Sequence, residues 1–125
     1  MSRPGPVLVV DDDATIRTFL KMALSDNGFD VMTAEHGLAA LDAVRRARPS
    51  VILLDMRMPI MDGWAFSLAY RQGSPPHAPI VVLTAARDAA QYAGEIEADA
   101  YLAKPFDLQE LMRVVGRLAE GASAP

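Results

Sequence analysis

The sequence predicts an α/β domain with a doubly wound parallel sheet of five strands and five helices. Short runs of large aliphatic residues alternate along the chain with segments whose apolar residues recur every three or four positions. The runs suit strands that are covered on both faces, and the periodic segments suit helices that pack against a sheet. Because strand and helix patterns alternate throughout, we expect parallel strands joined by helical crossovers.

Strands are expected where aliphatic or alternating residues stop at a polar or turn residue. Three runs of four aliphatic residues, at 7–10, 51–54 and 80–83, indicate the buried centre of the sheet. Residues 29–34 alternate in polarity, which is typical of a strand nearer a sheet edge. In order, the expected strands are 7–10, 29–34, 51–54, 80–83 and 101–103.

Helices are expected in the periodic segments between those strands. The first helix has Asp13 in front of it as an N-cap and Gly28 behind it as a left-handed stop. The fourth segment is rich in alanine and is interrupted by Gly94. In order, the expected helices are 14–27, 37–46, 63–71, 85–96 and 108–119.

The composition is that of one ordinary domain and excludes several classes of site. The chain has 125 residues, about half of them apolar, and a net charge of −4, which gives no support to a nucleic-acid surface. It has no cysteine, which excludes disulfides, thiolate metal sites and a cysteine nucleophile. No apolar run is long enough to span a membrane, and the N-terminus lacks the apolar core of a signal peptide, so a cytoplasmic location is expected. We expect a disordered leader at 1–6, one domain at 7–120 and a disordered tail at 121–125.

Polar side chains follow four of the five expected strands. Asp11 and Asp12 follow the first strand, Asp55 the third, Thr84 the fourth and Lys104 the fifth. Because parallel strands end at the same edge of a sheet, three carboxylates, a hydroxyl and an ammonium should meet there.

The chemistry of this set predicts phosphoryl transfer. Three neighbouring carboxylates repel one another unless they take up protons or share a cation, and hard oxygen ligands favour Mg²⁺. Lys104 adds a compact positive charge that can pair with Asp55 and with a phosphate oxygen. A carboxylate in this setting is equipped to attack phosphorus and become an aspartyl phosphate.

Four motifs resemble the receiver domains of response regulators, the CheY-like superfamily of two-component signalling. The resemblance extends from about Val7 to Leu118, and it implies a flavodoxin-like sheet with the strand order 2-1-3-4-5. Each motif alone is common, but four in this order are specific. The motifs are residues 9–13 (VVDDD), 54–63 (LDMRMPIMDG), 83–85 (LTA) and 101–106 (YLAKPF).

The resemblance implies a phosphoacceptor and a magnesium site. Asp55 is similar to the aspartate that takes a phosphoryl group from the phosphohistidine of a histidine kinase or a phosphotransfer protein. Asp11 and Asp12 resemble the acidic pair that holds Mg²⁺, with Asp12 and Asp55 as direct ligands. Arg57 would contribute its backbone carbonyl to the same ion.

The resemblance also implies a switch. Thr84 resembles the hydroxyl that reorients onto the phosphoryl group, and Tyr101 resembles the aromatic residue that swings inward with it. Lys104 resembles the lysine that bonds the phosphoryl group, and its bond to Pro105 resembles a cis peptide of the family. Taken alone, Tyr101 also suits a half-buried strand tyrosine.

The implied output is a protein-binding surface around the fourth helix, fifth strand and fifth helix. Such a module catalyses only its own phosphorylation and dephosphorylation, and it is a monomer or a phosphorylation-dependent dimer. We expect a stand-alone regulator that binds no DNA directly. The alternative is a receiver fragment of a larger transcriptional regulator or hybrid kinase.

Two departures from the family pattern affect these expectations. Glu97 stands where the family usually has a glycine after the fourth helix, and the span from Thr84 to Lys104 is slightly short. We therefore expect the fourth helix to be short, frayed or displaced. Arg57 and Ala86 occupy positions that tune the lifetime of the aspartyl phosphate, and Arg57 would either shield that group or pair with it.

A phosphohydrolase with an aspartate nucleophile is a further alternative. Enzymes that resemble the haloacid-dehalogenase group need a second aspartate two residues after the nucleophile. Arg57 stands at that position here, a base where an acid is required.

Overall fold

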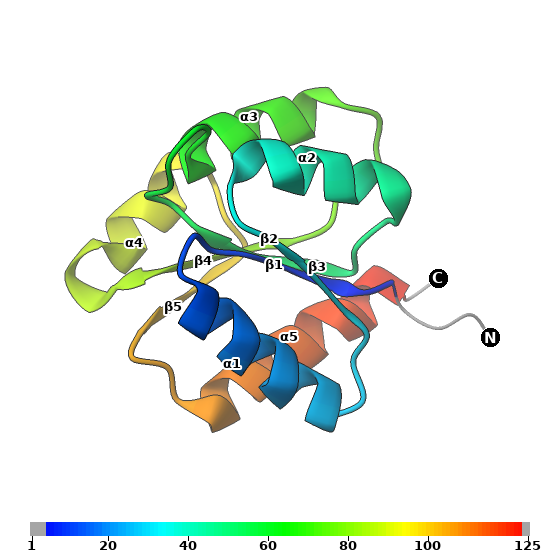
Figure 1. Ribbon diagram of the computed structural model, residues 1–125, viewed down its shortest axis with the longest axis vertical. Helices are drawn as coiled ribbons and strands as arrows, with labels where there is room; N and C mark the ends of the chain where they lie inside the picture. The colour runs from blue at the N-terminus through cyan, green and yellow to red at the C-terminus, as the bar shows by residue number, and fades with distance from the viewer. Residues whose placement is uncertain (1–4, 124–125) are drawn as a thin grey trace.

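The computed structural model describes residues 5–123, which fold into three layers with a sheet between two sets of helices (Figure 1). The strands are β1 Val7–Val10, β2 Val31–Ala34, β3 Val51–Asp55, β4 Ile80–Ala85 and β5 Ala100–Lys104. The helices are α1 Ala14–Asp26, α2 Gly37–Arg46, α3 Gly63–Gln72, α4 Ala86–Glu95 and α5 Leu108–Ser123.

The sheet is parallel throughout and has the strand order β2-β1-β3-β4-β5. This confirms the predicted flavodoxin-like fold. The chain returns to the far side of β1 after β2, so β1 and β3 become neighbours, with Val10 opposite Leu54. The residues that follow these two strands therefore lie side by side at the carboxyl edge of the sheet, where such folds bind ligands.

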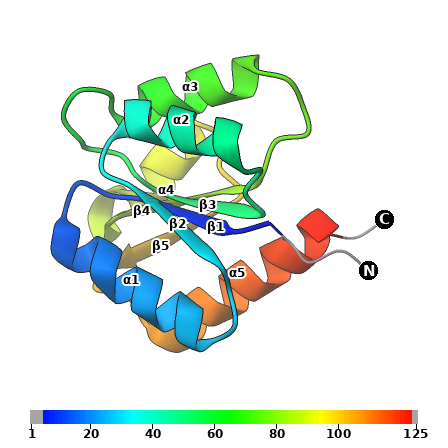
Figure 2. The ribbon, with the colours of Figure 1, turned by 45° about the vertical axis from the view of Figure 1, so that its right-hand side comes forward.

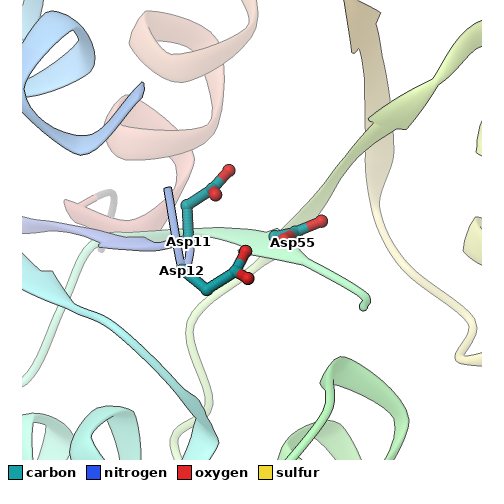
Figure 3. Close-up of side chains that lie close together, drawn as sticks. All are labelled: Asp11, Asp12 and Asp55. Atoms are coloured by element: carbon teal, nitrogen blue, oxygen red, sulfur yellow. The ribbon is translucent and has the colours of Figure 1, made fainter. Parts of the chain in front are cut away.

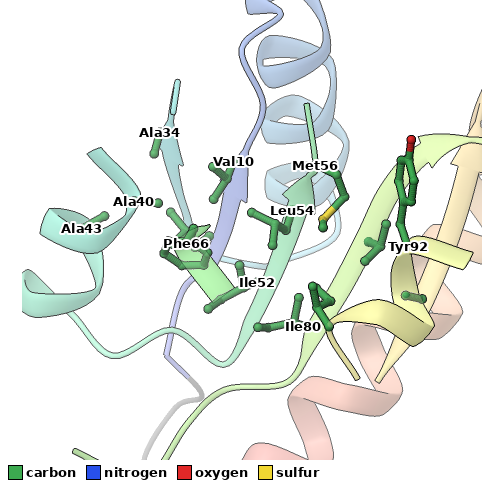
Figure 4. Close-up of a cluster of buried hydrophobic side chains, with 14 residues drawn as sticks. Val10, Ala34, Ala40, Ala43, Ile52, Leu54, Met56, Phe66, Ile80 and Tyr92 are labelled. Atoms are coloured by element: carbon green, nitrogen blue, oxygen red, sulfur yellow. The ribbon is translucent and has the colours of Figure 1, made fainter. Parts of the chain in front are cut away.

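Helices cover both faces of the sheet (Figure 2), and an apolar core on each face packs them against it. Successive residues of β3 alternate between them, because side chains of a strand point to opposite faces in turn. Ile52 and Leu54 face α2, α3 and α4, where they pack with Phe66 (Figure 4). Leu53 faces α1 and α5 and packs with Leu20 on that side. Both faces of the central strands are thus covered, which explains their uninterrupted aliphatic sequence.

Side-chain caps fix the helix starts near the carboxyl edge. The Asp13 carboxylate accepts a bond from Thr15 N at 2.9 Å, and Asp62 accepts one from Ala65 N at 2.9 Å. His36 caps α2 through its Nδ1, which accepts from Ala39 N at 3.1 Å and gives this residue a structural role. At the other end of α1, Gly28 has a φ of 90°, as its position after the helix predicted.

Three element boundaries differ from the sequence expectation. β2 begins at Val31 rather than at Phe29, because Phe29 N closes the end of α1 by donating to Leu24 O at 3.1 Å. α4 spans ten residues, Ala86–Glu95, against the expected 85–96, which agrees with the expectation of a short helix, and Gly94 is its second-last residue. α5 extends to Ser123, past the predicted end at Ala119, and so takes in the first residues of the expected tail.

The last two residues of the expected leader are anchored. Ser50 donates its hydroxyl to Gly5 O at 2.7 Å and its backbone N–H to Pro6 O at 2.9 Å. The rest of the expected leader and tail, residues 1–4 and 124–125, lies outside the described residues. None of the helices in the described part of the chain is long and apolar enough to cross a membrane.

Candidate functional site

Three carboxylates meet at the carboxyl edge of the sheet, as the sequence predicted (Figure 3). Asp11 and Asp12 follow β1, and Asp55 is the last residue of β3. One carboxylate oxygen from each lies within 4.8 Å of the others. Asp11 and Asp55 are buried, whereas Asp12 is exposed. The cluster is therefore open to solvent on one side only.

Lys104 supplies the positive charge expected in this cluster. Its Nζ lies 3.0 Å from Asp11 Oδ2 and 3.8 Å from Asp55 Oδ1. The lysine ends β5, two strands away from β3, so its side chain reaches along the edge over β4. The following peptide bond, between Lys104 and Pro105, is cis.

The Asp55 carboxyl has a strongly perturbed affinity for protons. Its pKa is raised from 3.8 to about 7, first by burial and second by the neighbouring Asp11 carboxylate. Lys104 acts in the opposite direction but does not offset these two effects. The site therefore disfavours the ionised form of Asp55 relative to an exposed aspartate.

The ligand atoms of this cluster fit a hard divalent cation. Asp11, Asp12 and Asp55 present oxygen donors within 4.8 Å of one another. Such oxygen-only sets suit Mg²⁺, which binds through one or two carboxylates and keeps several waters. The raised pKa of Asp55 agrees with such a site, because burial and then the neighbouring Asp11 carboxylate disfavour the ionised carboxylate more than Lys104 favours it.

Asp11 is held in place by the chain around it. Asp13 N donates to Asp11 Oδ1 at 2.9 Å, and Arg17 Nη1 on α1 donates to the Asp11 carbonyl at 2.6 Å. Arg17 was not among the residues predicted from the sequence. Its position in the first turn of α1, close to the end of β1, could have indicated this contact.

The loop between β3 and α3 is tightly bound to the site. Gly63 N donates to Met56 O at 2.9 Å, and a Cβ on Gly63 would lie 2.8 Å from the Asp55 carbonyl oxygen. Between them, Met61 N bonds Pro59 O at 2.7 Å around Ile60, whose φ is 71°. A γ-turn centred on a β-branched residue is strained.

The side chain of Arg57 lies in this loop but binds away from the cluster. Its Nη2 and Nε donate to Tyr92 Oη on α4 at 2.7 and 3.1 Å. The guanidinium carbon also lies 5.7 Å from the centre of the Trp64 ring. Trp64 in turn donates its indole N–H to Glu95 at 2.9 Å. No pattern in the sequence marked Tyr92, Trp64 or Glu95 as residues of this site.

Thr84 and Tyr101 lie on neighbouring strands and on the same face of the sheet. Tyr101 pairs with Val82, two residues before Thr84, so the two side chains are diagonal neighbours. Thr84 is buried, whereas Tyr101 is 48% exposed. In this structure the Tyr101 side chain is therefore half exposed to solvent and points outward.

A search of known families agrees with the fold and the site. A model described as the response regulator receiver domain matches residues 7–116. The chain is 41% identical over 108 residues to "Response regulator MprA" of Mycobacterium tuberculosis, covering 85% of this chain and 46% of that protein. It is 38% identical over 123 residues to "Probable transcriptional regulator ycf27" of Porphyridium aerugineum, and this match covers 94% of this chain and 50% of that protein. The chain thus spans about half the length of these relatives.

Solved structures share the whole fold. A putative response regulator from Chloroflexus aurantiacus superposes with a TM-score of 0.85 at 36% identity, covering 94% of this chain and 99% of the other. The chemotaxis response regulator CheY4 of Vibrio cholerae gives a TM-score of 0.82 at 34% identity, with the same coverage. With the acidic cluster at the edge of a 2-1-3-4-5 sheet, these matches show that the chain belongs to the response regulator receiver domains of two-component signalling.

Proposed function

We propose that Asp55 is the phosphoacceptor of this receiver and takes its phosphoryl group from the phosphohistidine of a histidine kinase or a phosphotransfer protein. The observation that carries the proposal is the meeting of three carboxylates within 4.8 Å beside the Lys104 ammonium. Asp55 is buried and is the last residue of the central strand β3, and the carboxyl end of such a strand is where this fold presents a reactive group.

The residues divide the chemistry between them. An ionised Asp55 oxygen attacks phosphorus, the P–O bond forms as the P–N bond breaks, and the imidazole nitrogen takes up a proton. Lys104, already 3.8 Å from Asp55, pairs with an oxygen of the transferred group. The acidic cluster is typical of the Mg²⁺ site of receivers, and a bound Mg²⁺ would offset charge on the transferring group. We assign it to Asp11, Asp12, Asp55 and the backbone carbonyl of Arg57.

The output step in this proposal uses Thr84 and Tyr101. The Thr84 hydroxyl bonds the phosphoryl group, and the outward Tyr101 moves into the space that Thr84 vacates. The two residues are diagonal neighbours on β4 and β5, which supports a direct coupling. The target protein would bind the face formed by α4, β5 and α5, where Tyr101 and Leu108 are exposed at 48% and 45%.

The partner kinase, the location and the oligomeric state of this receiver domain are also proposals. Receiver domains work with histidine kinases, and the identity of the kinase is open. A stand-alone regulator in the cytoplasm, as a monomer or as a phosphorylation-dependent dimer, remains our prediction. The relatives that are about twice as long support the alternative of one domain in a larger regulator. The phosphohydrolase alternative gains no support, because position 57 carries a cation and the chain belongs to the receivers.

Phosphorylation by acetyl phosphate tests the proposal. The chain is incubated with acetyl phosphate and Mg²⁺, and its intact mass is measured. We expect a gain of one phosphoryl group that requires Mg²⁺ and is absent from Asp55→Asn. Asp13→Asn is the matched control, because asparagine retains the cap of α1 and lies outside the acidic cluster. Failure to modify the wild type, or equal modification of Asp55→Asn, would contradict the assignment.

A further inference from the structure

Arg57 lies against a pair of contacting aromatic rings, those of Trp64 and Tyr92, and is hydrogen-bonded to Tyr92. It donates two hydrogen bonds to Tyr92 Oη, at 2.7 and 3.1 Å, and its guanidinium carbon lies 5.5 Å from the Tyr92 ring centre and 5.7 Å from that of Trp64. The two rings meet edge to face with their centres 4.8 Å apart. Glu95 fixes the Trp64 indole by accepting its N–H. A long, exposed arginine side chain is thus held in one orientation against α3 and α4.

The same arginine borders the acidic cluster. A groove of about 340 Å³ runs between them and is lined by Asp12, Arg57, Met58, Pro59, Asp62 and Trp64. Arg57 is two residues from Asp55 along the chain, so a rotation of its side chain through this groove carries the guanidinium toward the cluster. In the described part of the chain no carboxylate forms an ion pair with Arg57. Its hydrogen-bond partner is the hydroxyl of Tyr92.

We propose that Arg57 is a phosphoryl-binding residue and that Tyr92 and Trp64 position it beside the acidic cluster until Asp55 is phosphorylated. The proposal rests on Asp55 being the phosphoacceptor. A phosphoryl group offers ionised oxygens in place of a neutral hydroxyl, and hydrogen bonds to ionised acceptors are about twice as strong. The guanidinium fork also suits two phosphate oxygens at once. Arg57 therefore exchanges Tyr92 for the phosphoryl group.

The exchange makes Tyr92 a competitor of the phosphoryl group. Both hydrogen bonds from Arg57 to Tyr92 must break before the guanidinium can bind the phosphoryl group. Tyr92 therefore weakens the binding of a phosphoryl group at Asp55. Removal of the Tyr92 hydroxyl should strengthen that binding, and only while Arg57 is present. Because Tyr92 belongs to α4, the release also removes the Arg57–Tyr92 hydrogen bonds that link this helix to the β3–α3 loop when Asp55 is modified.

Beryllofluoride is the probe for this competition, because it binds a receiver carboxylate as a phosphoryl mimic. Its apparent affinity with Mg²⁺ is measured by ¹⁹F NMR for wild type, Tyr92→Phe, Arg57→Met and the double variant. Tyr92→Phe keeps the ring that packs on Trp64 and loses only the hydroxyl. We expect Tyr92→Phe to bind about 3- to 10-fold more tightly and Arg57→Met about 10-fold more weakly. The double variant should match Arg57→Met within about twofold, since the two residues act through one bond.

Tyr70→Phe is the matched control for loss of a tyrosine hydroxyl. Tyr70 Oη accepts a bond from Ala78 N at 2.8 Å, in the loop that leads into the other end of β4, and the control should bind beryllofluoride as the wild type does. A change equal to that of Tyr92→Phe would overturn the proposal. Equal effects of Tyr92→Phe in the presence and absence of Arg57 would also overturn it.

The arginine itself gives a second readout in the wild-type chain. The Nε–H resonance of Arg57 should shift on beryllofluoride loading, together with the indole N–H resonance of Trp64, the only tryptophan. A ¹⁹F signal of the loaded site with both resonances unchanged would overturn the role of Arg57 and leave the phosphoacceptor intact. Absence of a loaded ¹⁹F signal would instead overturn the proposed function and this inference with it.

Discussion

Lys104 is bonded more closely to Asp11 than to the phosphoacceptor candidate Asp55, at 3.0 Å against 3.8 Å. The buried Asp11 carboxylate also accepts a bond from Asp13 N, so it orients the ammonium as well as carrying charge. Lys104 is thus positioned by one carboxylate to act at another. This relationship makes Lys104 the cation whose removal is most informative.

We predict that Lys104→Met slows phosphorylation of Asp55 by acetyl phosphate about a hundredfold. The variant removes the ammonium that faces the transferring group, and loss of one such stabilising donor has an effect of this size. The rate is followed by intact mass at saturating Mg²⁺. Lys21→Met, an exposed substitution on α1, is the control and should leave the rate unchanged. Equal rates for Lys104→Met and wild type would rule out the assigned role.

We predict that the metal-free chain loses stability as the pH rises from about 4 to about 7. The pKa of Asp55 is about 7 in the folded chain, because of burial first, against an ordinary 3.8. Between these two pH values the folded chain keeps a proton on Asp55 that the unfolded chain releases. The contribution of this proton to the free energy of unfolding is complete below pH 3.8 and is lost above about pH 7. The loss is at most about 4 kcal/mol.

Urea unfolding in EDTA at several pH values measures this loss, with Asp55→Asn as the reference. The free energy of unfolding of Asp55→Asn should lie above that of the wild type at pH 8 and approach it near pH 4. Adding Mg²⁺ at pH 8 should raise the stability of the wild type and have a smaller effect on the variant. A constant difference between the two chains across this range would contradict the perturbed pKa.

We predict that Gly63→Ala destabilises the chain by about 1–3 kcal/mol. The new methyl group would lie 2.6 Å from Met56 Sδ and 2.8 Å from the Asp55 carbonyl oxygen, which forces the loop off the site. Gly94→Ala is the matched control, because a Cβ there meets no atom within 4 Å. Gly94 is the second-last residue of α4, and there the same substitution should stabilise the chain by at most about 0.5–1 kcal/mol, the value for a helix interior. Thermal unfolding compares the two variants, and a change in stability of the same sign for both would be inconsistent with these contacts.

We predict that Glu97→Gly stabilises the chain by about 1 kcal/mol. Glu97 follows α4 with a φ of 52°, a conformation that glycine adopts without the cost a Cβ imposes. Its carbonyl accepts from Arg71 Nη2 at 3.1 Å through the backbone, so this bond survives the change. Glu97→Ala keeps the Cβ and should give no such gain. Denaturant unfolding of both variants distinguishes relief of strain from loss of the carboxylate.

The fold and the members of the acidic cluster could be predicted because both depend on position along the chain. Aliphatic runs at β1 and β3 mark central strands, and parallel strands must end at one edge. Asp11, Asp55 and Lys104 were therefore expected near one another for any conformation of the connecting loops. The predicted left-handed Gly28 and the cap by Asp13 depend on equally local signals.

The direction of Arg57 could not be predicted, because it depends on packing between α3 and α4. The sequence places the arginine two residues after Asp55 but carries no pattern that links it to Tyr92, 35 positions later. The strained turn at Ile60 was equally hidden, since a β-branched residue gives no signal for positive φ. The bond from Arg71 to the Ile96 carbonyl at the end of α4 was hidden for the same reason, since it depends on packing between α3 and α4.

Borohydride trapping is the most direct test of the assignment of Asp55. Sodium borohydride reduces an acyl phosphate to an alcohol, so a phosphorylated aspartate becomes homoserine, which is located by peptide mass spectrometry. After acetyl phosphate and Mg²⁺ treatment, we predict homoserine at position 55 and at no other aspartate. Homoserine at Asp11, Asp12 or Asp13, or none at all in a chain that has gained a phosphoryl group, would contradict the assignment of Asp55 as the phosphoacceptor.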